Sequence, residues 1–129
     1  MAKSQPWDWF PMIPLYAFTS VKKARKFVKK RIGADYEFTG KNGECTWYEC
    51  DNGFCIIVLQ CADYSSAKKH GVLAHECVHY MQFYAKCAGT TLDEETEAYI
   101  TQSAVSACID QIGEEWFSET QQTSKSSEG

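Results

Sequence analysis

The chain has 129 residues, of which 44% are hydrophobic and 14% aromatic, and it carries a net charge of −4. A chain of this length buries one hydrophobic core and is too short for two ordinary domains. The composition lies in the globular range and excludes a mainly disordered or fibrous protein. We therefore predict a single domain over residues 1–117. Residues 118–129 turn polar and small, which predicts a disordered tail.

No signal peptide is recognisable at the start of the sequence, and no apolar stretch approaches the length of a membrane span. We therefore expect a cytoplasmic protein without a membrane partner. In a reducing compartment the seven cysteines are expected to be free thiols that pack as small hydrophobic side chains. A structural zinc at Cys45, Cys50, Cys55 and Cys61 is the alternative, although their spacing contains no Cys-x-x-Cys.

The first segment, residues 1–19, holds all three prolines and many aromatic residues. Prolines exclude a regular helix, so we expect an extended arm across the core, with a partner-binding arm as the alternative. A helix from Ser20 to about Ile32 follows, with Ser20 as its N-cap and Gly33 at its end. Its seven basic residues are interpreted as a solvated face rather than a surface for nucleic acid or anionic membrane: Lys22, Lys23, Arg25, Lys26, Lys29, Lys30 and Arg31.

The pattern then changes to strands, over residues 36–39, 45–49 and 54–60. Asp51-Asn52-Gly53 predicts a hairpin between the last two strands. Residues 54–59 are apolar on both faces, so this strand should be covered on both sides. We also expect its edge to accept an extended peptide as an added strand.

Two further helices are predicted. One runs over about residues 67–87, with Ser65 or Ser66 as its N-cap and Gly89 at its end, and the other over about residues 92–112 before Gly113. The first is apolar around most of its circumference and should be central and largely buried. The predicted fold class is α+β. A small antiparallel sheet of about three strands packs with this central helix, the basic N-terminal helix and the C-terminal helix.

The central helix contains the segment His75-Glu76-Cys77-Val78-His79. Residues four apart project from the same face of a helix, so His75 and His79 can bind one metal ion. Glu76 lies one position further round and can act as the base for a metal-bound water. His70 points about 140° away from His75 and is excluded as a ligand. A metal-free core cluster is the alternative, but burying three polar groups without a compensating partner is costly.

This motif resembles the His-Glu-x-x-His motif of the zincin metallopeptidases. The Glu-x-x-Ala-Tyr arrangement of Glu95, Ala98 and Tyr99 is similar to the second motif of the gluzincin clan. The resemblance implies one catalytic Zn²⁺ with Glu95 as its third ligand. Glu94 is the runner-up, because it falls on the inward stripe of the same helix with Val105, Ile109 and Ile112. The resemblance also leaves open which group orients the histidines, because Tyr99 stands where larger gluzincins carry an aspartate.

The resemblance covers about residues 54–112. It is closest to very small single-domain gluzincins (minigluzincin-like) and to short predicted metallopeptidases of bacteriophages and bacteria. It implies a monomeric zinc metallopeptidase that hydrolyses peptide bonds of a peptide or protein substrate by a metal-activated water, with Glu76 as general base. The alternative is a zincin-like metal-binding regulatory or interaction module with little or no proteolytic activity. A purely structural role in a larger assembly is the third possibility.

Overall fold

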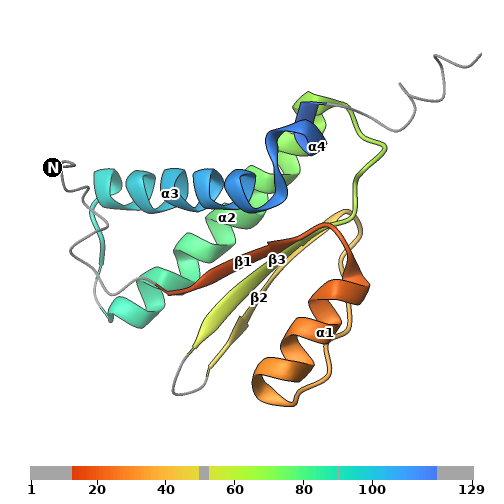
Figure 1. Ribbon diagram of the computed structural model, residues 1–129. Helices are drawn as coiled ribbons and strands as arrows, with labels where there is room; N and C mark the ends of the chain where they lie inside the picture. Colours follow the sequence, from red (N-terminus) through yellow and green to blue (C-terminus); the bar gives the residue numbers. More distant parts are fainter. Residues whose placement is uncertain (1–12, 50–52, 90, 119–129) are drawn as a thin grey trace, which may run out of the picture.

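The protein has an α+β fold, which confirms the predicted fold class. The computed structural model describes residues 13–49, 53–89 and 91–118. Helix α1 covers one face of a three-stranded sheet, and α2 and α3 cover the other face (Figure 1). In chain order the elements are β1 (Leu15–Phe18), α1 (Val21–Ile32), β2 (Gly43–Tyr48), β3 (Phe54–Leu59), α2 (Ser66–Ala88), α3 (Glu94–Ile112) and α4 (Glu114–Ser118).

The sheet is mixed, so the predicted antiparallel sheet is wrong in one respect. Strand β3 is central and pairs with β1 in parallel and with β2 antiparallel. The parallel pair is possible because α1 and β2 lie between β1 and β3 in the chain and supply the long crossover that it needs. Since both edges of β3 are paired, the expected docking of a peptide at its edge is also wrong. Both β1 and β2 are edge strands, but the outward backbone groups of Leu15 and Ala17 in β1 bond to the side chain of Gln111. The free edge of the described sheet is therefore that of β2.

The third strand is β1 rather than residues 36–39, which form a loop. Part of the predicted arm has therefore become a strand of the sheet. Residues 1–12 of this arm lie outside the described residues, as do residues 50–52 with the predicted hairpin turn and residues 119–129 of the predicted tail.

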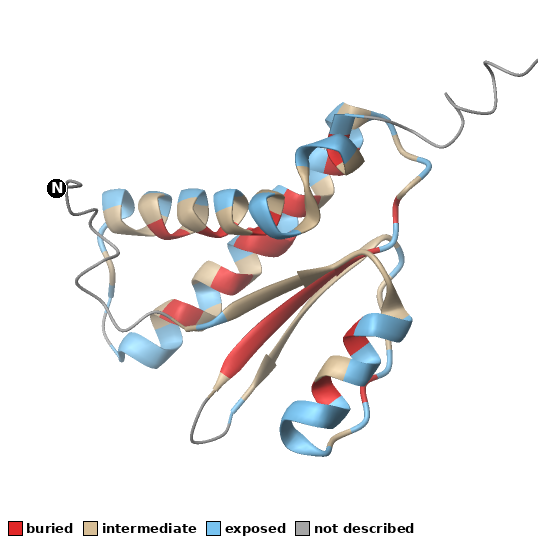
Figure 2. Ribbon diagram, in the orientation of Figure 1, coloured by how far each residue is buried: buried red, intermediate tan, exposed pale blue. Residues whose placement is uncertain are grey.

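The side chains of β3 form the centre of both core layers. All six are fully buried, and Figure 2 shows β3 as a continuous buried strand. Alternate residues point to opposite sides of the sheet. Phe54, Ile56 and Val58 pack with α1, whereas Cys55, Ile57 and Leu59 pack with α2 and α3. The prediction of a strand covered on both faces is confirmed.

The predicted helix ends are confirmed by their caps. The Ser20 hydroxyl accepts a hydrogen bond from the Lys23 N–H at the start of α1, and Ser65 caps α2 in the same way. Gly33 and Gly89 end these helices in the left-handed conformation, at φ of 71° and 69°. No helix in the described part of the chain is both long enough and apolar enough to cross a membrane.

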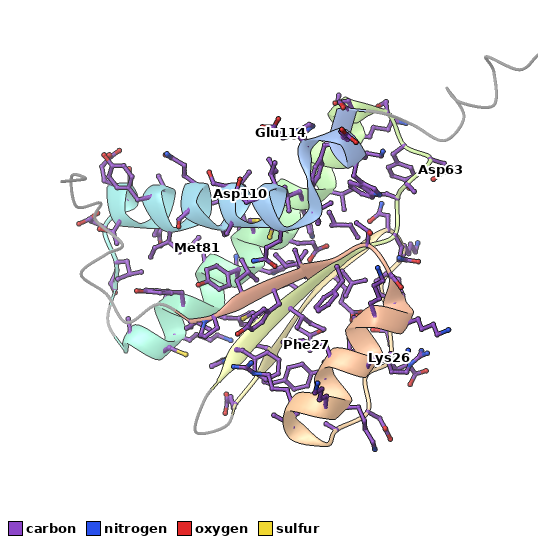
Figure 3. All side chains as sticks on the ribbon, viewed as in Figure 1. Lys26, Phe27, Asp63, Met81, Asp110 and Glu114 are labelled. Carbon is purple, nitrogen blue, oxygen red and sulfur yellow. The ribbon has the colours of Figure 1, made fainter. Side chains whose placement is uncertain are left out.

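The basic residues of α1 are all exposed. Figure 3 shows Phe27 between α1 and the sheet and Lys26 on the outer side of the helix. Phe27 packs its ring against Tyr16, Phe18 and Phe54. Most charged side chains thus form the outer face of an amphipathic helix, as expected, whereas the Arg31 guanidinium lies 4.9 Å from the centre of the Phe54 ring.

The described cysteines are free thiols, in agreement with the prediction. Four are buried, Cys45 is partly buried and Cys87 is exposed. The alternative of a structural zinc includes Cys50, which lies outside the described residues.

The loop between α1 and β2 is held by one carboxylate that the sequence analysis did not single out. Glu44 accepts hydrogen bonds from the Tyr36 hydroxyl (2.5 Å) and from the backbone N–H groups of Thr39 and Gly40 (2.9 Å each). Burial alone would raise the pKa of Glu44, but these hydrogen bonds outweigh burial and lower the pKa below its ordinary value. The charge therefore stabilises the folded loop.

Replacing Glu44 by Gln keeps the shape of the side chain and removes its charge. We expect the free energy of unfolding at pH 7 to fall by about 1–2 kcal/mol, because charge-assisted hydrogen bonds are lost at a partly solvated site. A lowered folded-state pKa gives stability above the unfolded pKa that is lost as the pH falls through the folded pKa. In urea titrations the difference from the wild type should therefore shrink below about pH 4.

Glu37→Gln is the control, because Glu37 lies in the same loop but is exposed to solvent, whereas Glu44 is partly buried. An equal loss of stability in both variants would contradict the anchoring role of Glu44.

Candidate metal centre

Helix α2 packs closely on the first residue of β2. A Cβ atom added to Gly43 would lie 2.6 Å from Cγ1 of Val72 and 3.2 Å from Oε2 of Glu76. These distances are shorter than ordinary van der Waals contacts, so only glycine permits this approach. The contact places Glu76 beside the end of the sheet.

This packing determines which face of α2 is buried. Leu73, Tyr80 and Tyr84 are fully or almost fully buried, whereas His75 and Val78 are exposed. The prediction of a largely buried helix is therefore wrong. The apolar residues on the outer side of α2 are too far round the helix to reach either the sheet or α3.

The structure brings His75, Glu76 and His79 together. One possible ligand atom from each residue lies within 4.8 Å of the others, and the two imidazole rings have centroids 5.0 Å apart. Two imidazole nitrogens one helical turn apart suit Zn²⁺, and the Glu76 carboxylate beside them lies where a base for a metal-bound water would be needed. The chemistry of these residues therefore fits the metal that the motif implies.

Glu76 is the unusual member of this group. Its side chain is only 5% exposed, and no described residue forms a hydrogen bond or an ion pair with its carboxylate. Burial raises the pKa of Glu76, and His75 and His79 offset only part of this effect. The carboxylate faces the open pocket beside these imidazoles, and a cation bound there would stabilise its charged form further.

His79 is oriented by a residue that the sequence analysis missed. Its Nδ1 lies 3.0 Å from Oε1 of Gln82, one turn further along α2. When Nδ1 carries the proton and donates to this oxygen, Nε2 keeps its lone pair for a metal. The spacing of three residues between His79 and Gln82 could have indicated this contact, but polar pairs at that spacing are common on helices.

The two predicted third-ligand residues are not part of this group. Glu95 and Glu94 are both exposed, in the first turn of α3. Helix α3 meets α2 through the contact of Cys108 with Cys77.

The position of α3 explains the separation. On a helical wheel centred on Tyr80, Cys77 lies about 60° to one side, whereas His79 and His75 lie about 100° and 140° to the other. Helix α3 therefore packs on the flank of α2 that is remote from the histidines. His70 also lies apart, with its ring against Phe117 at 5.1 Å, which confirms that it points away from the site.

An open pocket of about 560 Å³ adjoins the group. Its walls are Asn42 and Gly43 at the start of β2, where Asn42 directly precedes the strand, Tyr64 from the loop before α2, and one face of α2 from Lys68 to Glu76. The pocket therefore connects a buried carboxylate with an exposed ammonium group. It was not visible in the sequence, since it joins three separate segments.

The free edge of β2 lies next to the same site. The Gln60 N–H donates to the Asn42 carbonyl, so alternate residues of β2 from Asn42 onward form the hydrogen-bonded pairs with β3. The backbone groups of Gly43, Cys45 and Trp47 consequently point away from β3. They form an unpaired row along the edge of the described sheet.

Comparison of the chain with protein-family models, with curated proteins and with solved structures found no match.

A methyl group at Gly43 should disturb the site, whereas one at Gly71 should not. We expect Gly43→Ala to lower the free energy of unfolding by about 1–3 kcal/mol, because Val72 must move. Gly71 lies inside α2, and a Cβ there would meet nothing within 4 Å. Gly71→Ala should therefore stabilise the protein by about 0.5–1 kcal/mol.

Urea unfolding of both variants measures these changes. Stabilisation by Gly43→Ala would contradict the close packing of α2 on β2.

Proposed function

We propose that this protein is a zinc-dependent metallopeptidase in which His75 and His79 hold one Zn²⁺ and Glu76 is the general base. The observation that carries the proposal is the grouping of a mostly buried carboxylate with two imidazoles on one helix, at the edge of an open pocket. The predicted motif and the geometry of the three side chains support the same chemistry.

The residues of the site have separable roles. A zinc ion held there would act as a Lewis acid on a peptide carbonyl and lower the pKa of water. The Glu76 carboxylate would accept a proton from the attacking water and later pass it to the leaving amine. Burial raises the pKa of Glu76, which favours a carboxyl group that holds the proton between the two transfers. Gln82 would fix the ring of His79.

The substrate that fits this site is an extended peptide. The outward N–H and C=O groups of Gly43 and Cys45 lie on the strand that Glu76 contacts, so a peptide added along β2 would pass beside the carboxylate. Main-chain hydrogen bonds would then hold the substrate. This role belongs to β2, in place of the strand that the sequence analysis favoured.

The remaining expectations belong to the same proposal. We propose a cytoplasmic monomer that acts on a peptide or protein and has neither nucleic acid nor membrane as a partner. The free thiols of the described residues fit a reducing compartment. The solvated basic face of α1 lies across the sheet from α2, away from the proposed site (Figure 1).

A second candidate function is favoured by one observation. Glu95 and Glu94 stay outside the group formed by the motif residues, so the described structure offers fewer ligands than a catalytic zinc usually has. A metal-binding regulatory or interaction module with little or no proteolytic activity would need no such ligand. The resemblance still implies Glu95 as the third ligand of the peptidase, which requires the start of α3 to lie closer to the histidines than it does in this structure.

Zinc-dependent cleavage of a fluorogenic peptide library tests the two candidates. We expect Glu76→Gln to lower kcat/KM by about 100-fold to 10,000-fold while the protein keeps its zinc, because only the base is lost. Glu95→Gln should lower both the zinc content and the activity, and Glu37→Gln should lower neither.

If the wild type binds zinc but cleaves no peptide, the result supports the metal-binding regulatory or interaction module instead of the peptidase. Unchanged cleavage by Glu76→Gln would contradict the assigned base.

A further inference from the structure

The pocket beside the proposed centre has two ends of opposite chemistry. Lys68 and His75, both on its α2 wall, are seven residues apart, which places their backbones about 10 Å apart along the helix axis. Gly71 lies between them and leaves the wall open, because even an added Cβ there would touch nothing. The pocket is therefore a continuous groove between the proposed metal ligands and Lys68.

The end at Lys68 offers hydrogen-bond donors. The Asn42 side-chain N–H₂ donates to the Tyr64 hydroxyl oxygen over 3.3 Å, so the O–H of Tyr64 is left to donate elsewhere. The Lys68 ammonium lies 5.9 Å from the centre of the Tyr64 ring. The ion pair found among the described residues joins Lys29 and Asp35, so Lys68 has no carboxylate of its own there.

The opposite end carries His75 and Glu76, which belong to the proposed centre. An anionic ligand group is attracted beside Lys68, where the first turn of α2 adds a positive partial charge to that of the ammonium group. Neutral groups of a ligand are not attracted electrostatically to Lys68, and cationic groups are repelled by it. The pocket thus selects both the charge of a ligand and its direction along the groove.

We propose that this pocket binds a carboxylate of the peptide substrate, with Lys68 and Tyr64 as the residues that recognise it. The inference rests on the proposed peptidase function. An extended chain advances about 3.3 Å per residue, so a separation of about 10 Å places the carboxylate about three residues from the cleaved bond. Either an acidic side chain or the C-terminal carboxylate of the substrate supplies the same chemistry.

Peptide binding tests this specificity without relying on cleavage. The protein carries Glu76→Gln to prevent turnover, and its affinity for fluorescein-labelled hexapeptide pools is measured by fluorescence anisotropy with zinc chloride present. One pool fixes Glu at a chosen position and has an amidated C-terminus, a second has Gln in its place, and a third has Gln and a free C-terminal carboxylate. The second pool is the neutral reference, and the other two separate the sources of the carboxylate.

We expect one of the two anionic pools to bind about 5–10-fold more tightly than the neutral pool, as for a partly solvated, charge-assisted contact. Lys68→Glu should abolish or reverse this preference, and Lys68→Gln should abolish it. Tyr64→Phe should weaken it. Lys86→Glu makes the same charge change in the last turn of α2, outside the pocket, and should leave the preference intact.

Equal affinity for all three pools, or the same preference in Lys68→Glu and Lys86→Glu, would overturn the inference. Cleavage assays on the protein with Glu76 intact separate the two proposals. Zinc-dependent cleavage without charge preference removes the role of the pocket and keeps the peptidase. Charge-selective binding without cleavage removes the peptidase and keeps the pocket as a binding site.

Discussion

The close packing of α2 on Gly43 is the constraint on which the proposed site depends. It fixes the rotation of α2 about its axis, because Val72 and Glu76 can approach the sheet only where β2 has no side chain. Once that rotation is fixed, Glu76 is buried and His75 is left on the surface. The same contact places the free edge of β2 and the pocket at Lys68 beside the three motif residues.

The Glu76 carboxylate is the reason that we regard this arrangement as a candidate metal centre and not only as helix packing. A helix that covers a sheet normally places apolar residues on its inner face, and α2 does so with Leu73 and Tyr80. Glu76 interrupts that face and lacks a partner among the described residues. A cation held by the neighbouring imidazoles compensates such a charge, and the raised pKa of Glu76 suits proton transfer.

The fold was predictable from the sequence where local signals decide. Ser20, Gly33, Ser65 and Gly89 determine helix ends through contacts within a few residues, and the apolar run of β3 requires cover on both faces. The partner of β3 was not predictable, because the pairing of β1 with β3 joins segments about forty residues apart. Residues 36–39 resemble a strand in composition, but Glu44 holds them as a loop.

The part of the site that depends on local spacing was also predictable from the sequence, and the part that depends on helix packing was not. The spacing of His75 and His79 places both rings on one helix face by geometry alone, and the structure brings Glu76 into the same group. The flank of α2 on which α3 packs depends on the contact of Cys77 with Cys108, which the periodicity of neither helix specifies. The role of Glu95 therefore could not be decided from the sequence, since it depends on how two helices meet.

Zinc stoichiometry by native mass spectrometry tests the central claim most directly. The protein is purified without added zinc, and the wild type is compared with His79→Ala and with His70→Ala, whose ring packs on Phe117 away from the group. We expect one zinc per chain in the wild type and in His70→Ala, and none in His79→Ala. A metal-free wild type, or equal zinc in wild type and His79→Ala, would contradict a metal centre at His75 and His79.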